Sequence, residues 1–259
     1  MKQYRFDHKI NQIVVDGILQ GYKNFLEELR EKQETMKISS AYAWVRGNHI
    51  DDQTATLCEN VGIQYLYARA GYSWGYLQFT NEEERKMFIV KNGQYLDQTN
   101  VSKRKGISTN SSSIQLNKNN YLYKLAQINH NVDLRRSIQL QLPLDGEIVV
   151  YENDTLIDIV DDDLQELQDK YDYFYIITYE VDRSGMISRI QSLLPSPIDG
   201  RAYEIEDLTK YIETSDVDLT NIDTSIVYQG QEKLPAEYPE AIQYDITTYD
   251  DHAKSESGD

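Results

Sequence analysis

The first 62 residues have the hydrophobic spacing of helices. Apolar side chains recur every three or four positions over residues 9–34, with charged residues on the opposite side, and this period predicts one long amphipathic helix. A short helix is expected over residues 41–46, which Gly47 ends, and another over 53–60. Gly62 closes the helical region, since glycine is the usual residue after a helix.

Strand patterns follow Gly62. Residues 63–70, 72–79 and 86–91 are rich in aromatic and β-branched side chains, and Asn92-Gly93 favours a two-residue hairpin turn. Further along, the sequence predicts more strands and a few short helices. The expected strands are 138–142, 148–151, 155–160, 173–181 and 186–194, and the expected helices are 121–128, 161–171 and 204–213.

These elements predict an α+β fold in which N-terminal helices pack on a mostly antiparallel sheet. Residues 1–97 and 121–215 are expected to form one domain, with a polar loop at 98–120 between its halves. Residues 216–259 lose the apolar periodicity and hold 11 acidic against 2 basic residues. We expect them to form an acidic, mobile tail, because so few apolar groups cannot offset the entropy of ordering.

Charge is divided unevenly along the chain. Residues 1–143 hold 19 Lys and Arg against 14 Asp and Glu, whereas residues 144–259 hold 7 against 29, and the whole chain carries −17. A field of this sign repels nucleic acid and attracts basic surfaces. This asymmetry bears on binding partners and solubility and does not indicate a chemical reaction.

Cysteine content and hydropathy indicate a cytoplasmic protein. A single cysteine, Cys58, excludes an internal disulfide and fits a reducing compartment. The N-terminus lacks the apolar run of a signal peptide, and no stretch approaches the roughly 18 apolar residues of a membrane span. With 40% apolar residues the chain can still bury a core.

The common motifs of enzymes and cofactor sites are missing from the sequence. It has no glycine-rich nucleotide loop, no His-Glu-x-x-His and no Gly-x-Ser-x-Gly, so no cofactor is indicated. Two similar segments, Asn48–Asp52 and Asn129–Asp133, place a histidine near carboxylates. If they converged they could bind a divalent metal and support a nuclease or other hydrolase. The candidate ligands are His49, Asp51, Asp52, His130 and Asp133. The alternative is that these Asn and Asp residues cap helices and shape turns.

Two clusters of charge suggest binding surfaces of opposite kind. The acidic one is a candidate for binding a basic partner and consists of Asp158, Asp161, Asp162, Asp163, Glu166 and Asp169. The basic one spans 103–136 and mixes cations with stackable rings, as single-stranded nucleic-acid binding requires. It consists of Lys103, Arg104, Lys105, Lys118, Tyr121, Tyr123, Lys124, Arg135 and Arg136. Either cluster can instead be a solvated face or loop.

Three stretches carry a resemblance to other proteins. Residues 46–55, residues 121–130, and residues 174–180 ahead of 202–208 are similar to uncharacterised proteins of low-GC Gram-positive bacteria and their phages and plasmids. The resemblance covers residues 40–213 and implies no catalytic residue. It implies an accessory protein of mobile elements, among which factors of host defence and counter-defence are common.

The sequence favours a non-enzymatic interaction protein, an inhibitor or regulator that offers acidic residues to a basic, nucleic-acid-binding surface of a bacterial protein. Acidity that serves only solubility is the simplest rival. A metal-dependent hydrolase and a nucleic-acid-binding protein remain as alternatives, and no pattern indicates the oligomeric state.

Overall fold

The computed structural model describes residues 2–70, 74–102, 120–132, 161–219 and 222–227. Its centre is a six-stranded sheet in which the strands follow one another in chain order. The strands are β1 (Gln64–Ala70), β2 (Trp74–Asn81), β3 (Lys86–Asn92), β4 (Tyr173–Val181), β5 (Ile187–Pro195) and β6 (Ala202–Asp207). β3 and β4 run parallel, and the other neighbouring pairs are antiparallel. The predicted α+β class is thereby confirmed.

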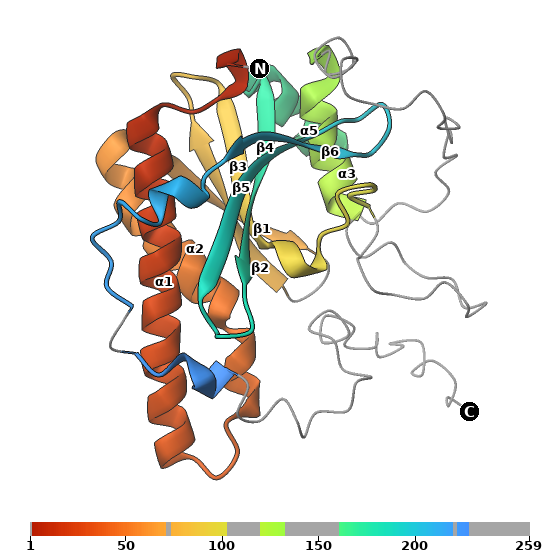
Figure 1. The fold of residues 1–259 in the computed structure, drawn as a ribbon. Coiled ribbons are helices and arrows are strands. Elements are labelled where there is room, and N and C mark those ends of the chain that lie inside the picture. The colour runs from red at the N-terminus through yellow and green to blue at the C-terminus, as the bar shows by residue number, and fades with distance from the viewer. Residues whose placement is uncertain (1, 71–73, 103–119, 133–160, 220–221, 228–259) are drawn as a thin grey trace, which may run out of the picture.

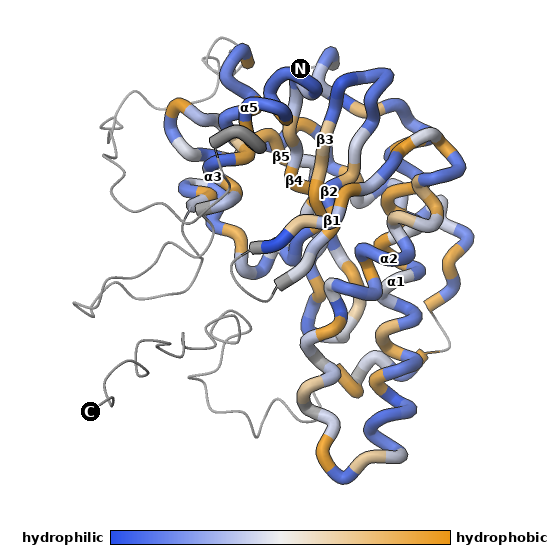
Figure 2. Tube along the Cα trace, turned by 180° about the vertical axis from the view of Figure 1, so that it is seen from behind, coloured by the Kyte–Doolittle hydropathy of each residue, from blue (hydrophilic) through white to orange (hydrophobic). Residues whose placement is uncertain are grey.

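Helices cover both faces of the sheet (Figure 1). α1 (His8–Thr35) and α2 (Arg46–Cys58) lie on one face, and α3 (Asn120–Ala126) and α5 (Asp161–Lys170) lie on the other. Each face has its own apolar core, because successive side chains of a strand point to opposite sides. Figure 2 shows hydrophobic residues following the central strands, with hydrophilic residues along the outer turns.

Helix α1 confirms the long helix predicted from the periodicity. Asp7 caps it, and its side chain accepts a hydrogen bond of 2.8 Å from the backbone N–H of Lys9. The apolar stripe is buried against the sheet and α2, and Tyr22 within it donates from its hydroxyl to the carbonyl of Gly185 at 2.7 Å. The stripe therefore serves the protein's own core.

Two glycines in α1 let α2 approach closely. A Cβ on Gly21 would lie 2.5 Å from the carbonyl oxygen of His49, and one on Gly17 would lie 2.6 Å from the Cα of Thr54. Because these neighbours are backbone atoms, neither position can take a side chain without moving α2. Gly47 does not end a helix as predicted; it lies in the first turn of α2, and a 3₁₀ segment, Ser40–Trp44, precedes that helix.

The dipeptide Asn92-Gly93 does not form the predicted hairpin turn. β3 pairs with β4 in parallel along its whole length, so the chain leaving β3 must cross over before it returns. The Asn92 side chain instead accepts a 2.9 Å hydrogen bond from the N–H of Gln94 and begins a 3₁₀ turn, Gly93–Tyr95. A turn signal is local, and tertiary pairing has overridden it.

Strand β6 stands where the sequence predicted a helix over residues 204–213. Residues 202–207 pair with β5, and only Thr209–Tyr211 forms a single 3₁₀ turn. Burial of Ile205 in the core and pairing with β5 outweigh the helix propensity of this glutamate-rich segment. The predicted helix is therefore wrong.

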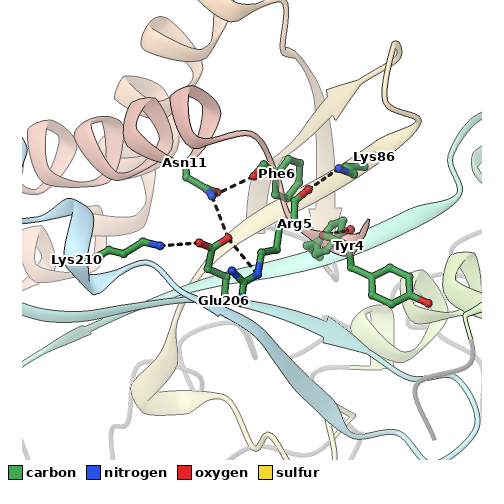
Figure 3. Close-up of polar contacts among 8 residues, drawn as sticks. Tyr4, Arg5, Phe6, Asn11, Lys86, Glu206 and Lys210 are labelled. Carbon is green, nitrogen blue, oxygen red and sulfur yellow. Dashed lines mark hydrogen bonds and ion pairs between the residues drawn. The ribbon is translucent and has the colours of Figure 1, made fainter. Parts of the chain in front are cut away.

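A polar network ties the segment before α1 to this strand (Figure 3). Glu206 is 8% exposed, and its carboxylate accepts hydrogen bonds from Asn11 at 3.2 Å and from Lys210 at 2.9 Å. Arg5 lies 3.9 Å from the same carboxylate, and Lys86 donates to the Arg5 carbonyl at 2.8 Å. The buried charge is tolerated because it is paired and hydrogen-bonded.

The predicted tail begins too early. Leu219, Ile226 and Val227 are buried in the core beneath α1, and Gln33 of α1 donates to the Ile226 carbonyl at 3.2 Å. Thr224 also donates to the Ser184 carbonyl at 2.6 Å. Scattered apolar residues in an acidic segment are thus enough to dock it on the domain. Residues 228–259 lie outside the described part of the chain.

Several other predicted elements cannot be compared with the structure. The strands expected at 138–142, 148–151 and 155–160 and most of the loop at 98–120 lie outside the described residues. The remaining strands match their predicted ranges within a few residues. Cys58 is fully buried, and burial raises the pKa of its thiol to about 12. None of the described helices is long and apolar enough to cross a membrane.

Candidate functional site

A hollow of about 310 Å³ lies between α2 and the hairpin of β1 and β2. One wall is a single stripe of α2 and the 3₁₀ turn that follows it, and the other comes from both strands. The lining residues are Asn48, Asp51, Asp52, Ala55, Thr56 and Glu59 on the helical side and Tyr65, Tyr67, Gly75, Tyr76 and Leu77 on the strand side. The hollow therefore combines three carboxylates with three phenol rings.

The helical wall follows from the period of α2. Helical periodicity places the residues four, seven, eight and eleven positions after Asn48 on the same side of the helix as Asn48. These residues are Asp52, Ala55, Thr56 and Glu59. The opposite side, with Ile50 and Thr54, packs against α1. Asp52 and Glu59 are exposed, and no described lysine, arginine or histidine forms an ion pair with either of them or with Asp51.

Two exposed tyrosines are the part of the strand wall that β1 contributes. Tyr65 is 47% exposed and Tyr67 is 65% exposed, although both carry large apolar rings. The Tyr67 ring lies across Gly75, where a Cβ would come within 2.6 Å of ring carbons. The guanidinium of Arg69 lies 5.8 Å from the centre of the Tyr67 ring, which shows that this ring can receive a cation.

Asp51 sits where the sheet opens. β2 pairs with β1 from Trp74 to Thr80 but with β3 only through residues 79–81, so among the described residues the middle of β2 has no partner on the β3 side. The Asp51 carboxylate accepts the N–H of Leu77 there at 3.1 Å. Burial raises the pKa of Asp51 to about 7, and the hydrogen bond from Leu77 offsets only part of this shift.

This pKa predicts a pH dependence that Asp51→Asn should remove. The folded state holds the Asp51 proton more tightly than the unfolded chain does, so its contribution to stability falls as pH rises from about 4 to about 7. Asparagine still offers an oxygen to Leu77. Relative to wild type, we expect Asp51→Asn to gain roughly 2–3 kcal/mol in free energy of unfolding between pH 5 and pH 8. Urea denaturation at both values measures the gain, and the exposed Asp52→Asn serves as control. An equal gain for both variants would contradict the prediction.

Behind the opening, aromatic residues close the other face of the sheet. Tyr76 and Tyr121 of α3 face each other with ring centres 5.2 Å apart, and Lys91 donates to the Tyr121 hydroxyl at 3.0 Å. Burial raises the pKa of both tyrosines above its usual range, and the nearby Asp51 carboxylate adds to this shift. These phenols are therefore hydrogen-bonding groups of the interior rather than proton acceptors.

The two histidine segments do not behave as predicted helix caps. Asn48 and His49 lie inside α2, and the His49 ring contacts Glu28 at 3.1 Å, on the α1 side, while Asp51 turns to β2. His130 lies in a 3₁₀ turn, Gln127–Asn131, and its Nδ1 is 3.2 Å from the Gln127 carbonyl. Asp133 is outside the described residues. Among the residues that are described, no three potential ligands gather as a metal site would require.

The predicted acidic cluster lies on α5, apart from one residue. Asp158 is outside the described residues, and Asp161, Asp162 and Asp163 form the first turn of α5. Glu166 pairs with Lys170 at 2.5 Å, and the lysine lowers the pKa of the glutamate. The Asp169 carbonyl accepts a hydrogen bond from Arg85 at 2.8 Å.

Most of the predicted nucleic-acid segment also lies outside the described residues. This part consists of Lys103, Arg104, Lys105, Lys118, Arg135 and Arg136. Within α3, Tyr121 and Tyr123 pack against the core, and Tyr123 donates to the Pro197 carbonyl at 3.3 Å. Lys124 also has a partner. The two rings are therefore engaged within the fold and are not presented as a stacking platform.

Sequence reasoning missed Glu59, Tyr65 and Tyr67. A signal was present: residues 63–70 place Tyr-Leu-Tyr in succession without the polar alternation of a half-buried strand.

Searches with the sequence and the structure give no match to a protein-family model, to a curated protein or to a solved structure. A function has therefore to be inferred from the chain's own residues.

Proposed function

We propose that this chain is a non-enzymatic interaction protein that binds a basic surface of another protein through the hollow between α2 and β1. The observation that carries the proposal is the lining of the hollow, where three carboxylates without a described ion-pair partner meet exposed tyrosine rings. Lysine and arginine side chains bind to such a surface by charge and by stacking on the rings.

The carboxylates at the hollow are charges that the described part of the fold leaves without an opposite charge. Elsewhere the described part of the chain pairs its buried charge, as Glu206 does with Asn11 and Lys210. Asp52 and Glu59 stay exposed beside the hollow. Tyrosine is the residue type that protein interfaces favour, because it gives large contact area at small entropic cost. A partner cation would lower the pKa of Asp51 and so bind its charged form.

The same lining argues against catalysis at this position. It includes no histidine, cysteine, lysine or serine, so the commonest pairings of a nucleophile with a base, Ser–His and Cys–His, are absent from it. His49 points to Glu28 while Asp51 points to Leu77, so the residues of the hydrolase hypothesis are turned to different neighbours. Binding is the use that these side chains support best.

The resemblance noted in the sequence gives the proposal a setting. We place the protein in the cytoplasm of a low-GC Gram-positive bacterium or among the products of its mobile elements, as an inhibitor or regulator. Its target would be a bacterial protein whose nucleic-acid-binding surface is basic. The net charge of −17 speeds the encounter with such a surface.

Charge reversal at the hollow tests this proposal. In the variant Asp52→Lys/Glu59→Lys we expect binding of a fluorescent ten-residue oligo-arginine peptide to weaken about tenfold at roughly 0.1 M salt. The matched control, Glu82→Lys/Glu83→Lys, makes the same change of net charge at two exposed residues of the β2–β3 turn. It should change binding less than about twofold, as fluorescence anisotropy would show.

If both variants weakened binding of the peptide equally, binding would depend only on net charge. The hollow would then not be the binding site. A pulldown from host lysate with the wild type and both variants, at low and at high salt, then identifies the natural partner. The partner expected from the proposal is basic and is lost with the hollow variant alone.

A further inference from the structure

The outer edge of β1 has no partner strand in the described part of the chain. The sheet runs from β1 to β6, and β1 pairs only with β2. Its exposed N–H and C=O groups are a template for pairing with another strand. Tyr65, Leu66 and Tyr67 are 47%, 47% and 65% exposed, so apolar side chains project from both faces of this edge.

Nothing in β1 protects this edge as proteins usually do. The strand spans seven residues, Gln64–Ala70, and contains no proline. Its register with β2 runs without a bulge from Gln64 to Ala70. Arg69 is its one charged residue, and the guanidinium lies 5.8 Å from the centre of the Tyr67 ring. Edge strands that stay unpaired are typically short, bulged or rich in charge.

Antiparallel pairing of two β1 strands would bring the arginine of one copy to a tyrosine of the other. Tyr65, Tyr67 and Arg69 share one face of the strand, because side chains alternate, and both tyrosines line the hollow. Glu59 precedes the strand by five residues and lines the same hollow as Tyr65. Two antiparallel copies of β1 centred on Tyr67 would place each Arg69 opposite the other copy's Tyr65, at the hollow that Glu59 also lines.

We propose that the occupant of this edge is a second copy of the chain, paired β1 to β1 about a twofold axis at Tyr67. The inference rests on the proposed function in treating the hollow as a protein-binding face, and it names Arg69 of the second copy as the cation received there. The two sheets become one continuous twelve-stranded sheet across the axis. An isologous contact of this kind closes on itself and forms no fibre.

A single introduced cysteine tests the geometry. Tyr67 would face its own copy across the axis, and directly opposed Cβ atoms in an antiparallel pair lie about 4.5–5.5 Å apart. Tyr67→Cys should therefore form a covalent dimer on mild oxidation. The native Cys58 is fully buried and gives no background. Ile38→Cys, at a residue 78% exposed after α1, is the matched control and should stay monomeric.

Sedimentation velocity of the wild type and of charge-swap variants tests the chemistry. The wild type should dimerise below about 0.1 mM, and Arg69→Glu or Glu59→Arg alone should raise the dissociation constant about tenfold. The double variant Arg69→Glu/Glu59→Arg should restore it. A wild type that is monomeric at 0.1 mM, equal cross-linking of both cysteine variants, or a double variant that is no better than the single ones would each overturn the inference.

These outcomes separate the inference from the proposed function. A monomer whose oligo-arginine binding still depends on Asp52 and Glu59 ends the second-copy inference and leaves the proposed function intact. A dimer linked through Tyr67 supports the pairing, and if oligo-arginine binding to the monomeric Arg69→Glu variant is then indifferent to the Asp52→Lys/Glu59→Lys change, the proposed function ends.

Discussion

Asn129→Ala is expected to lower the free energy of unfolding by roughly 3–5 kcal/mol. Asn129 is completely buried, and its side chain joins two strands. Its amide donates to the carbonyls of Phe174 at 2.9 Å and Pro195 at 2.8 Å, and its oxygen accepts the N–H of Phe174 at 2.8 Å. Alanine leaves these three backbone groups without a partner, and each buried orphan costs about 1–3 kcal/mol.

The control for this prediction lies two residues away. Asn131 is exposed, so Asn131→Ala should change stability by less than about 0.5 kcal/mol. Urea denaturation of the three proteins gives both differences, provided that the slopes agree. If Asn129→Ala proved as mild as Asn131→Ala, water would have to replace all three hydrogen bonds. The side chain of Asn129 would then not be needed to hold β4 and β5 together.

Gly21→Val should cost about 3 kcal/mol or more and lower the melting temperature by roughly 6–12 °C. The first added carbon already meets backbone atoms of α2, with the His49 oxygen and the Ile50 Cα both at 2.5 Å. α2 must shift outward, and the side of it that packs on α1 loses contact. Thermal unfolding followed by far-ultraviolet circular dichroism measures the effect.

The sign of the stability change in Gly21→Ala tests whether close contact with α2 is the cause. In an exposed helix interior, exchange of glycine for alanine stabilises by about 1 kcal/mol. At Gly21 the same exchange should destabilise, because contact with α2 outweighs helix propensity. The exposed Glu27→Ala on the same helix is the control and should be nearly neutral. A stabilised Gly21→Ala protein would show that α1 and α2 can separate freely.

Elements with a strong period of their own could be predicted from the sequence. α1 and the central strands β4 and β5 carry long apolar patterns, and their predicted bounds lie within one residue of those observed. Patterns that depend on distant residues failed. β6 is a strand because β5 lies beside it, and Asn92-Gly93 is no hairpin because β4 pairs with β3.

The candidate site could be predicted only in part. Asp51 and Asp52 stood out in the sequence, but as metal ligands with His49, which the fold turns toward Glu28 instead. The role of Asp51 depends on β2 pairing with β3 only from Phe79 onward, a tertiary fact with no local signature. Tyr65 and Tyr67 were visible as strand residues; their exposure depends on β1 being the last strand of the sheet.

Among the strands that the structure describes, one parallel pair divides the sheet into two consecutive meanders, β1 to β3 and β4 to β6. Each meander is built from neighbouring segments, whereas Lys86 and Tyr173, which pair where the meanders meet, are separated by a long stretch of chain. Closing that stretch must precede any gain from the contact, so we expect the docking of β4 on β3 to be the slow step of folding. During synthesis, the first meander therefore leaves the ribosome with the β3 edge uncovered until β4 follows.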